Sequence, residues 1–100
     1  MLNWPFNDPP LVAVITTKSI VKGGEWISYV SHDLEDGAWQ FHPPGDLVPV
    51  EEASVVALKE IIDMDPSIIE LADLPLGWYA YRETKDSKWI RKNKLIETVN

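Results

Sequence analysis

One short polar segment between two strand-forming segments most constrains the fold of this chain. Residues 33–37 are Asp-Leu-Glu-Asp-Gly, a composition typical of a turn, and they separate residues 25–32 from residues 38–42. Both flanking segments carry aromatic or β-branched residues, which favour strands. We therefore predict a β-hairpin with a five-residue loop, which commits the chain to antiparallel pairing.

The predicted loop length also decides which side chains face the core. A loop of residues 33–37 places Tyr29 opposite Phe41 and Ser31 opposite Trp39. Because side chains alternate along a strand, this register gives one inner face and one wetter face. The inner face is predicted to hold Ile27, Tyr29, Ser31, Trp39 and Phe41. The wetter face is predicted to hold Ser28, Val30, Gln40 and His42.

The segments before and after the hairpin predict further strands. The β-branched run at residues 11–17 suits a buried strand, and residues 18–21 either continue it or turn. Gly23-Gly24 should end this first unit. Two successive prolines, Pro43 and Pro44, should end the hairpin, because neither has an N–H for the ladder.

Two short helices are predicted in the second half of the chain. Residues 54–56 suit either a short strand or a first helical turn. The apolar spacing of Leu58, Ile61 and Ile62 is helical, and this helix should stop before Pro66. Asp65-Pro66 resembles an N-cap followed by proline at the first helical position, which starts a second helix through Leu71.

Two last strands complete the predicted fold, at residues 77–82 and 88–92, separated by a turn. We predict an α+β domain with a twisted antiparallel sheet of four or five strands and two short helices on one face. At 100 residues the chain suits a single domain, with residues 1–10 as an extended, proline-containing lead-in.

Composition excludes several kinds of chemistry. The chain has no cysteine, which removes disulfides, thiolate metal sites and a cysteine nucleophile. No stretch approaches the roughly 18 apolar residues of a membrane helix, and no basic region precedes an apolar run at the start. We expect a cytoplasmic location and no contact with a membrane.

No residue pattern predicts catalysis. Ser31-His32-Asp33 contains the residue types of a hydrolase triad, but neighbours on a strand point to opposite faces. His32 and His42 should lie about four positions apart along the hairpin, roughly 13 Å, which is too far for one metal ion. Lys22-Gly23-Gly24 has neither phosphate-loop nor dinucleotide spacing. We predict no enzyme activity, no metal and no cofactor.

Charge is unevenly distributed along the chain, which has a formal net charge of −7. Residues 33–73 contain eleven acids and one base, Lys59, whereas residues 82–94 contain six of the nine bases. The acidic balance disfavours binding to nucleic acid, although the C-terminal bases interleave with Tyr81 and Trp89. The charge runs are either solvated faces or a surface for a basic protein.

Loops commonly carry recognition, so the acidic loops are the candidate binding surface. The candidate partner-binding residues in these loops are Asp33, Glu35, Asp36, Asp46, Glu51 and Glu52.

Three segments together resemble a bacterial family of unknown function that is grouped with the immunity proteins of polymorphic toxin systems. They are residues 15–24 (ITTKSIVKGG), residues 36–41 (DGAWQF) and residues 58–69 (LKEIIDMDPSII) leading to residues 74–77 (LPLG). The resemblance spans roughly residues 11–82. It implies an α+β binding domain that neutralises a toxin by occupying its surface, and it supplies no catalytic residues.

The sequence thus favours a small acidic protein-binding domain with an immunity-like role. The alternative is a small-ligand-binding or regulatory domain without catalysis. A deep pocket with converging polar groups would instead favour an enzyme.

Overall fold

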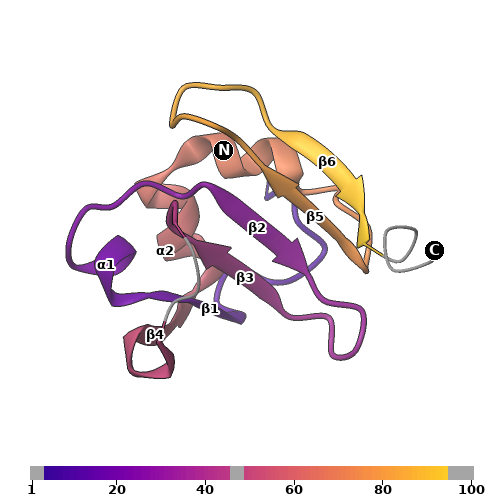
Figure 1. The fold of residues 1–100 in the computed structure, drawn as a ribbon. Coiled ribbons are helices and arrows are strands. Elements are labelled where there is room, and N and C mark those ends of the chain that lie inside the picture. The colour runs from indigo at the N-terminus through magenta and orange to yellow at the C-terminus, as the bar shows by residue number, and fades with distance from the viewer. Residues whose placement is uncertain (1–3, 46–48, 95–100) are drawn as a thin grey trace.

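The predicted hairpin is present and lies at the centre of a larger sheet. The computed structural model describes residues 4–45 and 49–94. These residues form a six-stranded sheet with the order β4-β1-β3-β2-β5-β6 (Figure 1). The strands are β1 (Ala13–Thr17), β2 (Tyr29–His32), β3 (Trp39–His42), β4 (Ala53–Ala57), β5 (Trp78–Tyr81) and β6 (Ile90–Asn93). The helices are α1 (Lys18–Val21) and α2 (Leu58–Met64), with 3₁₀ helices η1 (Val50–Glu52) and η2 (Pro66–Leu71).

The α+β class is confirmed, but the predicted sheet is wrong in two respects. It has six described strands rather than four or five, and it is mixed, because β1 runs parallel to β3. The chain reverses once before β2 and again at the hairpin turn, so β3 returns in the direction of β1. The ambiguous residues 54–56 belong to the extra strand, β4, which pairs antiparallel with β1 along its whole length.

The hairpin turn is confirmed, but its register is shifted by one residue from the prediction. The backbone N–H of Asp33 donates to the carbonyl of Ala38 at 2.8 Å, so Asp33 continues the ladder and does not belong to the loop. Gly37 closes the shorter loop with a φ of 72°, a conformation that favours glycine. The pairs are therefore Tyr29 with His42, Val30 with Phe41, Ser31 with Gln40, and His32 with Trp39.

This one-residue shift moves the side chains of β2 to the other face. Trp39 and Phe41 are buried as predicted, and Gln40 and His42 lie on the opposite face, also as predicted. Val30 is fully buried opposite Phe41, which corrects its predicted place on the wetter face. Tyr29 and Ser31 pair with His42 and Gln40 and share their face, which corrects the predicted inward position of both.

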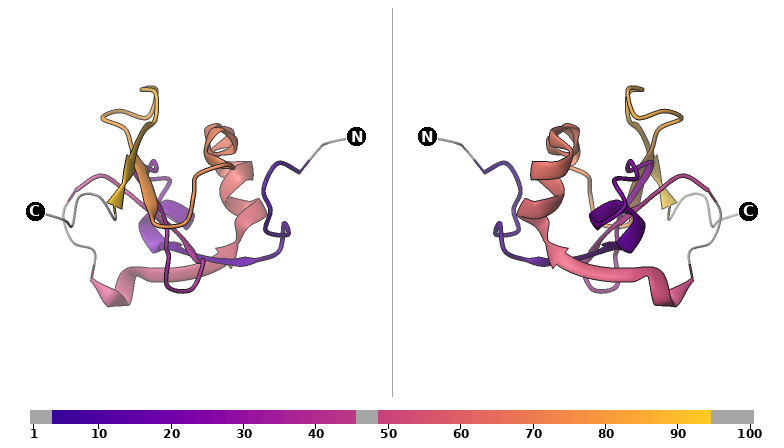
Figure 2. Two further views of the ribbon diagram at one scale, coloured as in Figure 1. Left: turned by 90° about the vertical axis from the view of Figure 1, so that its right-hand side faces the viewer. Right: turned by 90° about the vertical axis from the view of Figure 1, so that its left-hand side faces the viewer.

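Helix α2 and the 3₁₀ helix η2 cover one face of the sheet, as predicted (Figure 2). Helix α2 ends at Met64, before Pro66. The side chain of Asp65 then caps η2 by accepting from the backbone N–H of Ser67 at 3.1 Å. The apolar side chains of α2 and η2 pack against the inner face of the sheet and form one core with it. The fully buried members include Leu58, Ile61, Ile68, Leu71, Val14, Val30 and Phe41.

A buried arginine ties the sheet to this helical layer. Arg82 directly follows β5, and its side chain crosses the core edge to η2. Its Nη2 donates to the Asp65 carboxylate at 2.5 Å, and its Nη1 donates to the Ser67 hydroxyl at 3.0 Å. Its Nε donates to the carbonyl of Ile27 at 2.8 Å. Three parts of the chain that are distant in sequence are therefore fixed by one side chain.

Trp39 is the largest side chain in the buried core, and its removal tests the corrected hairpin. Its ring stacks on His32 with centroids 3.9 Å apart and meets the edge of Phe6 at 5.3 Å. We predict that Trp39→Ala lowers the free energy of unfolding by about 3–5 kcal/mol, because it leaves a cavity. Chemical denaturation measures this loss against a total stability of about 5–15 kcal/mol.

The matched control is Leu11→Ala, because Leu11 is 78% exposed. Its unfolding free energy should stay within about 0.5 kcal/mol of the wild type. An unchanged midpoint for Trp39→Ala would show that the inner face of β3 is assigned wrongly.

Candidate functional site

Aromatic side chains gather on the face of the sheet that is turned away from α2 and η2. The register pairs Tyr29 with Tyr81 and Ser31 with Tyr79, so Tyr29, Tyr79 and Tyr81 share this face. The rings of Tyr29 and Tyr79 stack with centroids 5.4 Å apart, and those of Tyr79 and Tyr81 are 6.3 Å apart. His42 joins them, 5.8 Å from Tyr29. We call these four side chains the aromatic face.

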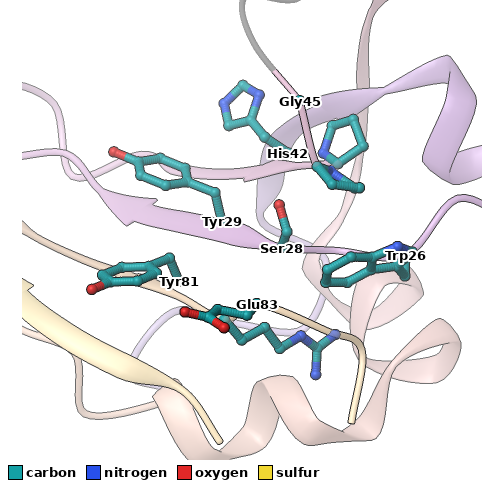
Figure 3. Close-up of a pocket in the computed structure, with 10 residues that line it drawn as sticks. Trp26, Ser28, Tyr29, His42, Gly45, Tyr81 and Glu83 are labelled. Carbon is teal, nitrogen blue, oxygen red and sulfur yellow. The ribbon is translucent and has the colours of Figure 1, made fainter. Parts of the chain in front are cut away.

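A groove of about 870 Å³ opens at one end of the aromatic face (Figure 3). Figure 3 shows Tyr29 and His42 along one side, Tyr81 and Glu83 along the other, and Ser28 between them. The lining residues are Trp26, Ser28, Tyr29, His42, Pro43, Pro44, Gly45, Tyr81, Arg82 and Glu83. They come from three segments that are brought together by the pairing of β2 with β3 and β5.

Local sequence explains how each side of the groove is built. Strand β3 ends at His42, as predicted, because the following Pro43 and Pro44 have no N–H to extend the ladder. Pairing continues past the strand ends at Ser28, whose N–H donates to the His42 carbonyl at 2.9 Å. The Ser28 carbonyl accepts from the N–H of Arg82 at 3.0 Å. These bonds hold Ser28 between the two sides of the groove.

Trp26 lies at one end of the groove, close to the guanidinium of Arg82. The guanidinium carbon of Arg82 lies 5.8 Å from the ring centroid of Trp26 and 4.2 Å from that of Trp89. A cation within about 6 Å of two aromatic rings is attracted to the face of each. The same arginine that binds the helical layer thus also lies next to Trp26, which lines the groove.

Burial keeps His42 uncharged at neutral pH. Its pKa is lowered because burial disfavours the protonated ring, and the negative charge of Asp33 opposes this effect only in part. The Gln40 amide donates to the Asp33 carboxylate at 2.6 Å, so its oxygen is free to accept from His42 Nε2 at 3.0 Å. Asp33, Gln40 and His42 form a hydrogen-bonded row along β3.

The candidate acids from the sequence do not form one patch. Asp33, Glu35 and Asp36 lie at the β2–β3 turn, where Asp36 accepts from the N–H of Ala38 at 2.9 Å. Glu51 and Glu52 belong to η1. Asp46 lies outside the described residues.

The two acidic groups lie at opposite ends of the strands. Ala53, which follows η1, pairs with Thr17 at the end of β1. Strand β1 is parallel to β3, so this end of the sheet is that of His42 and the groove. The turn at residues 33–37 lies at the other end. The structure therefore brings Glu51 and Glu52, and not the hairpin acids, to the end of the sheet that holds the groove.

Sequence reasoning missed the groove because it depends on pairing between distant segments. The alternation of Trp78-Tyr79-Ala80-Tyr81 could have placed Tyr79 and Tyr81 together on one face. The register error hid the contribution of Tyr29. Nothing local to Trp26 or Glu83 indicates that these residues meet at one groove.

The residue types of a hydrolase triad do not converge at residues 31–33. The ring of His32 stacks on Trp39, and its Nδ1 lies 2.8 Å from the carbonyl oxygen of Leu74. Asp33 instead accepts from Gln40. In residues 4–45 and 49–94, no three His, Cys, Asp or Glu side chains are grouped to hold a metal ion. The helices in these ranges are also too short or too polar to cross a bilayer.

Comparisons with protein-family models, with curated proteins and with solved structures found no match to this chain.

The lowered pKa of His42 predicts a pH dependence of stability. The unfolded chain has an ordinary histidine pKa near 6.5 and therefore binds a proton more readily than the folded chain. The free energy of unfolding should fall as pH drops below about 6.5, until the folded-state pKa is passed. His42→Gln should remove this part of the loss.

Urea denaturation of both proteins at several pH values between 7.5 and 5 gives the comparison. An identical decline in the wild type and in His42→Gln would show that His42 is not the group responsible.

Proposed function

We propose that this chain is a small protein-binding domain that recognises a basic partner, with an immunity-like role in neutralising a toxin. The observation that carries the proposal is the aromatic face with its groove. A sheet face that is turned away from the core usually carries polar and charged side chains. Here Tyr29, Tyr79 and Tyr81 lie in continuous ring contact instead.

Tyrosine and tryptophan suit a binding surface for physical reasons. Each provides a large apolar area together with one polar group, and few rotatable bonds are fixed when it is covered. Such residues are enriched where protein interfaces gain most of their binding energy. The aromatic face offers this chemistry on the sheet, and Trp26 adds to it at the groove.

The charge of the molecule supports a basic partner. The ion pairs among the described residues are Lys59–Asp63, Arg82–Asp65 and Arg91–Asp73. None of the described candidate acids at the hairpin turn or in η1 belongs to them. These acids lie at both ends of the sheet, and their charge is not neutralised by an ion pair within the described residues. In a chain of net charge −7, they attract a cationic protein over long range.

The proposed immunity-like role draws on the resemblance of residues 15–24, 36–41 and 58–69 to the toxin-immunity family. A binding domain of this kind acts by covering the surface of the toxin, so it requires no catalytic group. This is compatible with an aromatic surface that has no assembled triad or metal cluster in the described residues.

A small-ligand-binding domain is the alternative, and the size of the groove favours it. Its volume of about 870 Å³ falls in the range of pockets that hold small organic molecules, roughly 300–1,000 Å³. A small organic molecule that copurifies with the chain and protects Tyr81 and Trp26 would favour this reading. A toxin gene beside this one would favour the immunity-like role.

Charge reversal at the hairpin turn tests the electrostatic part of the proposal. Glu35→Lys combined with Asp36→Lys should slow association with the partner captured from native lysate. The wild-type rate should also fall as salt rises, since the Debye length shortens from ~10 Å at 0.1 M to ~3 Å at 1 M. Association kinetics at two salt concentrations measure both effects. Glu35→Lys alone keeps the hydrogen bond of Asp36 in the turn.

The matched control reverses the same number of charges on the helical layer, with Glu60→Lys and Glu70→Lys. Both residues are exposed on α2 and η2. This control should slow association less than the hairpin variant does. An acidic partner, or an association rate that ignores salt and both variants, would contradict the proposal.

A further inference from the structure

We propose that the groove beside Trp26, Tyr29 and Tyr81 receives a lysine or arginine side chain of the partner and pairs it with Glu83. This inference rests on the proposed function, because it names the chemical group that the protein-binding surface recognises. The two parts of the site are a set of aromatic walls and one carboxylate.

The aromatic rings and prolines that line the groove suit the binding of a cationic side chain. Trp26, Tyr29, His42 and Tyr81 contribute rings, and Pro43 and Pro44 contribute carbon surface. The face of an aromatic ring carries partial negative charge and attracts ammonium and guanidinium groups. The long apolar stem of lysine or arginine can lie along the same walls while its charged end reaches a polar group.

Among the described lining residues, Glu83 is the one whose charge is left for a ligand. The other formally charged lining residue, Arg82, is already neutralised by the Asp65 carboxylate in the helical layer. Figure 3 shows Glu83 on the same side of the groove as Tyr81. Glu83 is exposed, and it forms no ion pair or hydrogen bond within the part of the chain that the structure describes.

Among the described residues that line the groove, the one cation is Arg82, and it is already paired with Asp65. Burial lowers the pKa of His42, so its ring is neutral at pH 7 and presents an uncharged aromatic wall. With Arg82 paired to Asp65 and His42 neutral, the Glu83 carboxylate is the unpaired charge among the described lining residues, which favours a cation over a carboxylate or a phosphate. The groove is also larger than one side chain, so residues on both sides of the bound lysine or arginine can contact it.

The direct test compares two neutral-backbone probes that differ in charge but have nearly the same shape. N-acetyl-arginine methylamide carries a guanidinium, and N-acetyl-citrulline methylamide carries an uncharged urea in its place. Titration followed by NMR should show tighter binding of the arginine probe. The largest chemical-shift changes should fall on the Trp26 indole, Tyr81 and Glu83.

Two pairs of variants measure separately what the Glu83 carboxylate and the Tyr81 ring contribute to binding. Glu83→Gln should weaken the arginine probe to about the level of citrulline, whereas Glu60→Gln, the same change on α2, should leave it unchanged. Tyr81→Leu should weaken binding by about two- to fivefold, and Tyr81→Phe should keep most of it because the ring face remains. Thermal melts of each variant verify that the fold is intact.

Three outcomes would overturn the inference. They are equal binding of the arginine and citrulline probes, a Glu83→Gln variant that binds like the wild type, and tighter binding of a neutral proline-rich peptide at the same residues. If the probes fail while a basic partner still associates in a salt-dependent way, the groove assignment falls and the proposed function stands. If the probes bind as expected but no basic partner associates, the proposed function fails instead.

Discussion

The buried guanidinium of Arg82 is the constraint on which the arrangement of this molecule depends. Its side chain is 3% exposed, so the charge has lost almost all of its hydration. The loss is offset by the Asp65 carboxylate, by the Ile27 carbonyl and Ser67 hydroxyl, and by two tryptophan rings. If any of these partners is removed, the buried charge of Arg82 is no longer fully compensated. This cost keeps the sheet and the helical layer of α2 and η2 in one relative position.

The same residue links the core to the groove. Side chains alternate along β5 and its continuation, so an inward Arg82 requires that Tyr81 and Glu83 point outward. The guanidinium of Arg82 also lies 5.8 Å from the ring centroid of Trp26, which lines the end of the groove. Strand pairing brings the segments of the groove together, and the inward position of Arg82 directs Tyr81 and Glu83 outward toward it.

Features that depend on neighbouring residues could be predicted from the sequence. The turn between β2 and β3, the end of β3 before Pro43, and the capping of η2 by Asp65 follow from local chemistry and are present. The register of the hairpin could not be predicted, because it depends on whether the backbone of Asp33 joins the ladder. The parallel pairing of β1 with β3 and the assembly of the groove depend on contacts between distant segments. For the same reason, the acidic span of the sequence is divided between opposite ends of the sheet.

A double-mutant cycle between Arg82 and Asp65 tests the central role of this ion pair most directly. Arg82→Met keeps much of the side-chain volume without the charge, and Asp65→Asn keeps a capping residue for η2. The free energies of unfolding of both single variants and of the double variant come from urea denaturation. We predict that the double variant loses less stability than the sum of the single losses, with a coupling of about 0.5–3 kcal/mol. Additive losses would contradict the account, because the two charges would then stabilise the fold independently.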